Sequence, residues 1–132
     1  IVTDLDGDLE GVWDSERLCQ VLTNLVGNAV HHGAADQPVN ILADGTQSKT
    51  VAVTVRNRGA IPPELLPHLF NPFRGRERPP GRHQGLGLGL FIADQIVRTH
   101  GGRIEVQSAH DVTQFRVELP RVSRPLRSQE SV

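Results

Sequence analysis

The amino-acid sequence predicts an α+β fold, a two-layer sandwich in which one mixed, mostly antiparallel sheet is covered on one face by about three helices. The stretch from Asp14 to Gly33 has helical periodicity, whereas several short segments alternate apolar and polar residues. The turns between neighbouring alternating segments are short enough for antiparallel pairing. With 132 residues the chain is long enough for one hydrophobic core. We therefore expect one domain over residues 1–120 and a flexible tail over residues 121–132.

The composition excludes several classes of protein. Fourteen basic and fifteen acidic residues give a net charge of −1, which does not favour nucleic acid or a membrane surface as a partner. One cysteine, Cys19, rules out an internal disulfide and fits a reducing compartment. No apolar run approaches the roughly 18 residues that span a bilayer. We expect a soluble, cytoplasmic domain without direct membrane contact.

The predicted helix 14–33 carries two stripes side by side. The apolar stripe contains Leu18, Val21, Leu22, Leu25 and Ala29. The polar stripe contains Arg17, Gln20, Asn24, Asn28 and His31. A solvated helix face is one interpretation of the polar stripe, but such faces favour long charged residues over asparagine. Two asparagines one turn apart can instead offer oxygens to Mg²⁺ and its waters, so the stripe is a candidate site.

The remaining elements follow from alternation and from glycine and proline. Strand segments are expected within residues 1–13 and at residues 39–43, 50–57, 103–107 and 114–119. A loop over residues 108–112 is expected between the last two strands. A short helix is expected over residues 62–69, limited by Pro67, and a second long helix follows Gly85 and ends near His100.

The glycine run at the start of the second long helix is a candidate phosphate site. Gly85, Gly87 and Gly89 would bring free backbone N–H groups and the positive end of the helix dipole close to a ligand. This spacing alone is a weak signal, and an ordinary flexible helix start is the alternative. It matches neither a P-loop nor a dinucleotide fingerprint. The preceding segment 74–84 has four arginines and one glutamate, which fits a solvated loop or attraction of an anion.

Four motifs occur in one order along the chain. They are Asn24-x-x-x-Asn28-Ala29, Asn57-x-Gly59, Leu69-Phe70-x-Pro72-Phe73 and Gly85-x-Gly87-Leu88-Gly89-Leu90. Together they resemble the catalytic, ATP-binding domain of sensor histidine kinases, within the superfamily shared with gyrase B subunits and certain chaperones. The resemblance covers residues 7–120. It implies ATP and Mg²⁺ as cofactors, and transfer of the γ-phosphoryl group to a histidine on a separate helical dimerisation domain, with a response regulator downstream.

The resemblance also implies individual roles. Asn28 matches the Mg²⁺-binding asparagine, and Asn24 lines the triphosphate; these two would be the catalytic residues. His31 stands where the family usually has a phosphate-contacting lysine, whereas His32, at the rim of the apolar stripe, is expected to pack. Phe70 and Phe73 would flank a lid over residues 74–84. The residues expected to hold phosphates or the adenine are Gly85, Gly87, Leu88, Gly89, Asn57, Gly59 and Thr113.

The motif at Asn57 departs from the family pattern, which is usually Asp-x-Gly-x-Gly-Ile. This chain has an amide in place of the carboxylate, no second glycine and one residue fewer before Ile61. An amide oxygen still accepts a hydrogen bond from the adenine amino group but lacks charge assistance. A loss of about 1–2 kcal/mol corresponds to about tenfold weaker binding.

Two functions therefore remain from the sequence. The first is the kinase domain just described, which contains no histidine that resembles the phosphoacceptor and so is not expected to phosphorylate itself. The alternative is a degenerate nucleotide-sensing or structural module of the same fold without phosphotransfer. Asn57, the shortened loop and His31 favour the alternative, whereas the paired phenylalanines favour a histidine kinase over a serine kinase or a plain ATPase.

Overall fold

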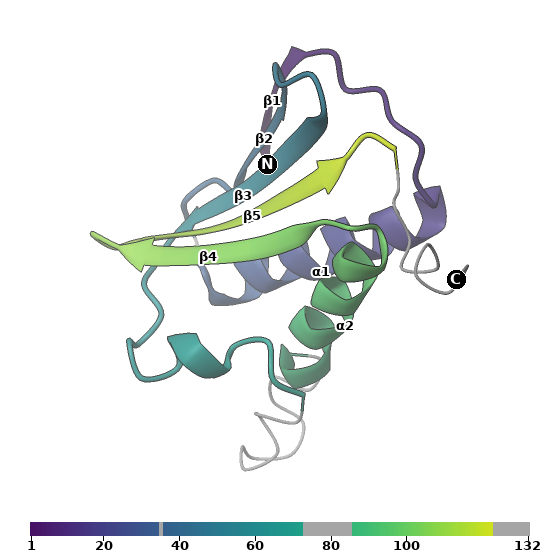
Figure 1. Ribbon diagram of the computed structural model, residues 1–132. Helices are drawn as coiled ribbons and strands as arrows, with labels where there is room; N and C mark the ends of the chain where they lie inside the picture. The colour runs from purple at the N-terminus through teal and green to yellow at the C-terminus, as the bar shows by residue number, and fades with distance from the viewer. Residues whose placement is uncertain (35, 73–85, 123–132) are drawn as a thin grey trace.

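The computed structural model describes residues 1–34, 36–72 and 86–122, and confirms the predicted fold class. One five-stranded sheet has the order β1-β2-β3-β5-β4, and both α-helices lie against the same face of it (Figure 1). The strands are β1 (Val2–Gly7), β2 (Asn40–Gly45), β3 (Thr50–Arg58), β4 (Arg103–Ala109) and β5 (Val112–Pro120). The helices are α1 (Ser15–His32) and α2 (Leu86–Thr99), with one short 3₁₀ helix, η1 (Leu66–His68). Among these five strands, β1 and β2 pair in parallel and the other three pairs are antiparallel.

The hydrophobic core lies between the helices and the central strands. Along β5 every second residue is buried, because successive side chains of a strand point to opposite faces. Phe115 is fully buried, with Val55 of β3 and Val106 of β4 beside it in register. The helices contribute Val21, Leu25, Ala29, Leu90, Ala93 and Val97 to the same cluster.

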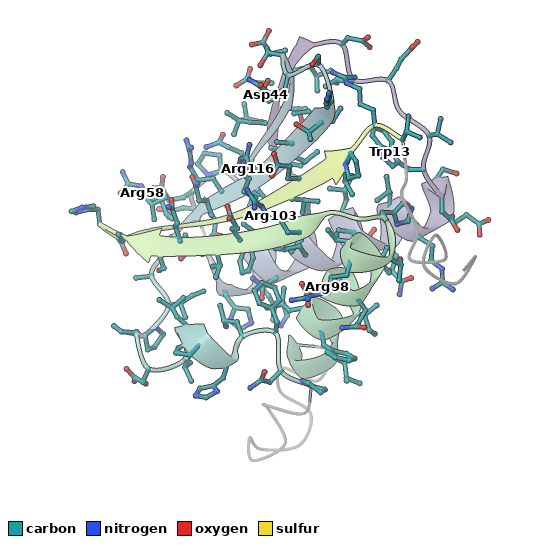
Figure 2. All side chains as sticks on the ribbon, in the orientation of Figure 1. Trp13, Asp44, Arg58, Arg98, Arg103 and Arg116 are labelled. Carbon is teal, nitrogen blue, oxygen red and sulfur yellow. The ribbon has the colours of Figure 1, made fainter. Side chains whose placement is uncertain are left out.

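The other face of the central strands is polar. Arg103 makes an ion pair with Glu118 at 3.0 Å, and Arg116 lies 3.8 Å from the same carboxylate. Both arginines lie on the side of the sheet away from the helices (Figure 2). These pairs are partly exposed, so each contributes little to stability. The nearby β2–β3 turn is held by Thr46, whose hydroxyl and backbone N–H both donate to Asp44 and lower the pKa of that carboxyl.

Helix α1 forms where the sequence predicts it. Asp14 caps its first turn by accepting from the backbone N–H of Arg17 at 3.1 Å. Two expectations for its side chains are wrong: Leu22 is 37% exposed, and His32 is exposed rather than packed. The buried stripe is narrower than expected, because α1 packs on β3 and α2 while Leu22 lies on the flank opposite to α2.

The prediction of a loop over residues 108–112 is wrong. Strand β4 continues to Ala109 and β5 begins at Val112, so the connection is the two-residue turn His110–Asp111. Both turn residues have positive φ, 55° and 62°. This backbone matches the right-handed twist of the flanking strands and permits the tight hairpin. As a result, Ser108 and Thr113 lie within strands and on a defined face of the sheet.

The predicted helix 62–69 is reduced to the single turn η1. Pro67 lies inside this segment and lacks the backbone N–H that an α-helical ladder needs there, whereas Pro62 and Pro63 fall in the first turn, where a missing N–H is tolerated. Within the described residues, no helix is both long and apolar enough to cross a membrane.

Contacts near the start of α1 tie the two helices, the segment before α1 and the end of β5 together. His100 accepts a hydrogen bond at Nε2 from the backbone N–H of Asp14, and its Nδ1 donates to the carbonyl of Ile96. Trp13 donates to the carbonyl of Pro120 at 2.7 Å (Figure 2). Arg121 donates to four carbonyl oxygens, those of Glu10, Gly45, Gln47 and Ser48. Arg121, the first residue of the expected tail, thus contacts the folded domain. Residues 123–132 of that tail lie outside the described residues.

Two glycines provide a matched test of this packing. A Cβ at Gly27, on the exposed side of α1, would meet no atom within 4 Å. Gly27→Ala should therefore stabilise the domain by about 0.5–1 kcal/mol, because alanine loses less conformational entropy in a helix. The melting temperature should rise by about 2–4 °C.

Gly102→Ala is the opposite case, because its Cβ would collide with the backbone carbonyl of Glu118. It should lower the melting temperature well beyond the gain at Gly27. Equal effects at the two positions would contradict the packing described here.

Candidate functional site

The two asparagines of α1 lie on the side of the helix that faces α2. Asn24 donates from Nδ2 to the carbonyl oxygen of Gly89 at 3.0 Å, which joins the middle of α1 to the first turns of α2. Gly89 also lies close enough that an added Cβ would be 3.8 Å from the Asn24 amide carbon. The predicted asparagine stripe and the predicted glycine run are thus brought together, although they are more than 60 residues apart in the sequence.

Asn28 lies one helical turn beyond Asn24 and has a different environment. Its side chain is half-buried and makes no hydrogen bond to the residues that the structure describes. A half-buried amide without a protein partner is unusual, because polar groups removed from water normally find one. Asn28 therefore has both its oxygen and its nitrogen available for a ligand.

The start of α2 supplies backbone donors beside these asparagines. Gly87, Leu88 and Gly89 belong to the first four residues of the helix, whose N–H groups have no partner within it. Leu88 is 41% exposed, so this part of the helix is open to solvent. Gly85 falls outside the described residues, as do Phe73 and the expected lid, 74–84.

His31 lies at the C-terminal end of α1. Its ring is exposed and stands 5.5 Å from the ring of His32 in an edge-on arrangement. The described residues contain no cluster of three or more His, Cys, Asp or Glu side chains able to hold a metal ion.

A row of three polar side chains ends the helix-facing side of the sheet. The strand register places Asn57 of β3 opposite Thr113 of β5, and Thr113 opposite Ser108 of β4. The next row toward the core is wholly apolar, consisting of Val55, Phe115 and Val106. The structure thus brings the predicted residues Asn57 and Thr113 together. It adds Ser108, which the sequence analysis missed because it placed that residue in a loop.

The chain after Asn57 turns sharply, and Thr113 holds it. Gly59 has φ of +120°, a conformation that strongly favours glycine, and its N–H donates to the carbonyl of Asp111 at 2.9 Å. The carbonyl of Gly59 accepts from the Thr113 hydroxyl at 2.7 Å. Ile61 donates from its backbone N–H to the Ser108 hydroxyl at 2.8 Å. The shortened motif therefore forms a well-defined loop.

Asn57 is 6% exposed, and its side-chain amide makes one hydrogen bond to the described residues. Nδ2 donates to the carbonyl of Arg58 at 2.8 Å, whereas Oδ1 accepts no hydrogen bond from the described residues. The end of α1 lies close by, because a Cβ on Gly33 would come within 3.0 Å of Nδ2. Gly33, the residue that ends α1, is thus a second residue near Asn57 that the motifs did not include.

Phe70 belongs to the core as well as to the expected site. Its ring packs edge-on against Phe115, with centroids 6.2 Å apart. Such an arrangement is favourable for aromatic pairs. Phe70 therefore anchors the segment after η1 beneath the sheet and is only partly exposed.

Two small cavities lie beside Asn57. One of about 160 Å³ is lined by residues of α1 and the start of β2, among them Ala29, Gly33 and Val39. The other, of about 100 Å³, is lined by Arg56 and Arg58. Pockets for nucleotide-sized ligands have volumes of roughly 300–1,000 Å³. Neither cavity by itself is large enough for such a ligand.

Comparison with known sequences places the chain in a family. The family of histidine kinase-, DNA gyrase B-, and HSP90-like ATPases matches residues 13–123. The bacteriophytochrome of Pseudomonas aeruginosa is 36% identical over 118 residues, which cover 88% of this chain and 16% of that protein. The sensor histidine kinase TrcS of Mycobacterium tuberculosis is 35% identical over 125 residues, covering 89% and 25%. The sensor protein VanS of Enterococcus faecium is 35% identical over 117 residues, covering 86% and 29%. The chain thus spans less than a third of these relatives.

Solved structures agree with the sequences. The nucleotide-free catalytic domain of histidine kinase ThkA superimposes with a TM-score of 0.75 and 30% identity, over 93% of this chain and 81% of that one. The mycobacterial sensor histidine kinase MprB gives a TM-score of 0.74 and 25% identity, over 95% and 83%. The chain therefore belongs to the histidine kinase-, DNA gyrase B-, and HSP90-like ATPases and is an ATP-binding catalytic domain of the sensor histidine kinase type.

Proposed function

We propose that the domain binds Mg²⁺-ATP along the seam between α1 and α2, with the triphosphate beside Asn24, Asn28 and the start of α2. The observation that carries this proposal is the half-buried Asn28 amide, which has no partner among the described residues. Asn24, by contrast, is engaged with Gly89 and holds the two elements together. One asparagine thus orders the site, and the other is available to the ligand.

The residues present fit a magnesium ion and a phosphate chain. Mg²⁺ prefers oxygen ligands and retains several waters, so a single amide oxygen from Asn28 completed by phosphate and water is suitable. When bound, the ion would neutralise charge on the phosphate oxygens. The N–H groups of Gly87, Leu88 and Gly89 and the helix dipole favour the same anion. His31, when neutral, would be a weaker phosphate partner than the lysine usual in the family.

The polar row supports the adenine end of the same ligand. The unpartnered Oδ1 of Asn57 is an acceptor for the adenine amino group, and Gly59 and Thr113 shape the loop beside it. Phe70, together with Phe73, which lies outside the described residues, would flank the lid. These roles are those implied by the family motifs.

The reaction that we propose is transfer of the γ-phosphoryl group to a histidine on a separate helical dimerisation domain of the same protein. Buried His100 is unsuitable as the acceptor, because both ring nitrogens are hydrogen-bonded within the fold. ThkA has been solved in complex with the response regulator protein TrrA. We propose that a response regulator likewise receives the phosphoryl group here, and that the whole protein works in the cytoplasm.

The alternative is a module that binds nucleotide without phosphotransfer. The amide at position 57 favours it, since a buried amide is a weaker acceptor than the usual carboxylate. A phosphorylation assay decides between the two. The domain is mixed with its helical domain and radiolabelled ATP, and label on the helical domain supports the kinase.

Asn28→Ala tests the metal site. It should abolish the Mg²⁺ dependence of ATP binding while leaving the melting temperature nearly unchanged, because the amide has no partner within the described fold. ATP affinity is measured by calorimetry with and without Mg²⁺. Gln20→Ala, two turns earlier on the same stripe and exposed, is the control and should bind like the parent. A retained Mg²⁺ dependence in Asn28→Ala would show that another group binds the ion.

Asn57→Asp tests the adenine contact. The charged acceptor should tighten ATP binding by about tenfold or less, because the variant also loses the donor to the Arg58 carbonyl. Preference for ATP over GTP should increase, since guanine places a carbonyl where the carboxylate would repel it. Titrating both nucleotides into both proteins measures this. No change in affinity or in preference would place Asn57 away from the base and favour the degenerate module.

A further inference from the structure

Ser108 lies in the polar row but matches none of the motifs that predicted the site. It belongs to β4, on the face toward the helices, directly opposite Thr113. Its hydroxyl accepts from the backbone N–H of Ile61 at 2.8 Å and lies 2.9 Å from the Thr113 hydroxyl. Ser108 therefore joins the loop after β3, residues 59–61, to the β4–β5 hairpin.

The direction of each hydrogen bond in this group follows from the atoms at its two ends. The backbone nitrogen of Ile61 can only donate, so the Ser108 oxygen accepts from it. The carbonyl of Gly59 can only accept, so the Thr113 hydroxyl donates its one proton to that carbonyl. The remaining proton between the two hydroxyls must come from Ser108. The three hydrogen bonds therefore form a chain, here called the relay, in which each group donates to the next: Ile61 to Ser108, Ser108 to Thr113, and Thr113 to Gly59.

This direction limits what Thr113 can do. Its side chain is 3% exposed, and its proton is already committed to Gly59. Toward a nucleotide Thr113 can therefore only accept a hydrogen bond. The main effect of Thr113 is on the 59–61 loop: Thr113 binds the carbonyl of Gly59 at one end, and Ser108 binds the N–H of Ile61 at the other.

The relay also affects the orientation of the Asn57 amide. Asn57 pairs in register with Thr113, and its amide is oriented by the carbonyl of Arg58, the residue immediately before the relay's acceptor Gly59. A shift of Gly59 would move Arg58 and turn the free Oδ1 of Asn57. The family's second glycine is missing here, so hydrogen bonds from the hairpin set the conformation of the shortened loop.

We propose that Ser108 is a positioning residue for the nucleotide base, which fixes the 59–61 loop through Thr113 and so orients the acceptor Oδ1 of Asn57. The proposal rests on the ATP-binding function proposed above. It assigns to Ser108 an effect on affinity and on base preference without contact with the ligand.

The test compares Ser108→Ala, Ser108→Thr and the neighbouring Gln107→Ala, which lies on the exposed opposite face of β4. Ser108→Ala should weaken ATP binding about fivefold, the effect of losing one hydrogen bond, and should reduce the preference for ATP over GTP. Amide hydrogen exchange at Ile61 should become faster. Ser108→Thr keeps the hydroxyl and should restore affinity and Ile61 protection to within about twofold, whereas Gln107→Ala should match the parent.

Each result has a distinct meaning. Faster exchange at Ile61 with unchanged ATP affinity and base preference would overturn the positioning role and leave the proposed function intact. Weaker binding of ATP and GTP by the same factor would also overturn it, because a purely structural loss does not select a base. A parent domain that binds no ATP would overturn the proposed function and this inference together.

Discussion

The packing of one sheet face against two helices holds the domain together and positions the residues of the candidate site. Phe115 stands at its centre, fully buried, with Leu25 of α1 and Leu90 of α2 in the same cluster. Burial of one such side chain is worth roughly 1.5–3 kcal/mol, so this row of side chains dominates the stability of a small domain. Because the opposite face of the central strands is polar, the sheet can be covered by helices on one side only.

That packing fixes how α1 is rotated, and the rotation decides what each asparagine does. With Val21, Leu25 and Ala29 directed at the core, the neighbouring polar stripe is directed at α2. Asn24 then meets the carbonyl of Gly89, whereas Asn28, one turn along, meets no described partner. The same residue type at helical spacing thus gives one asparagine that joins the two helices and one that has no partner among the described residues.

The polar row of Asn57, Thr113 and Ser108 places hydrogen-bonding groups where the apolar core ends. Buried polar groups are costly unless they are paired, and here the pairs are made with the 59–61 loop. Asn57 is less completely paired: at 6% exposure its Oδ1 accepts no hydrogen bond from the described residues. Beside these paired groups the Asn57 amide oxygen remains open to a hydrogen-bond donor, which is the basis of the role proposed above for Asn57.

Features that depend on local spacing could be predicted from the amino-acid sequence: the helical period of α1, the alternation of β3 and β5, the glycine run at the start of α2 and the motifs of the family. Segments where local signals conflict were predicted less well, as in the proline-rich stretch that forms only η1. Three features became apparent only from the folded chain: Ser108 belongs to a strand, Leu22 is exposed, and Asn28 has no side-chain partner among the described residues. These three features depend on strand register and helix rotation. Both are set by contacts between residues far apart in the chain, so a local sequence pattern does not predict them.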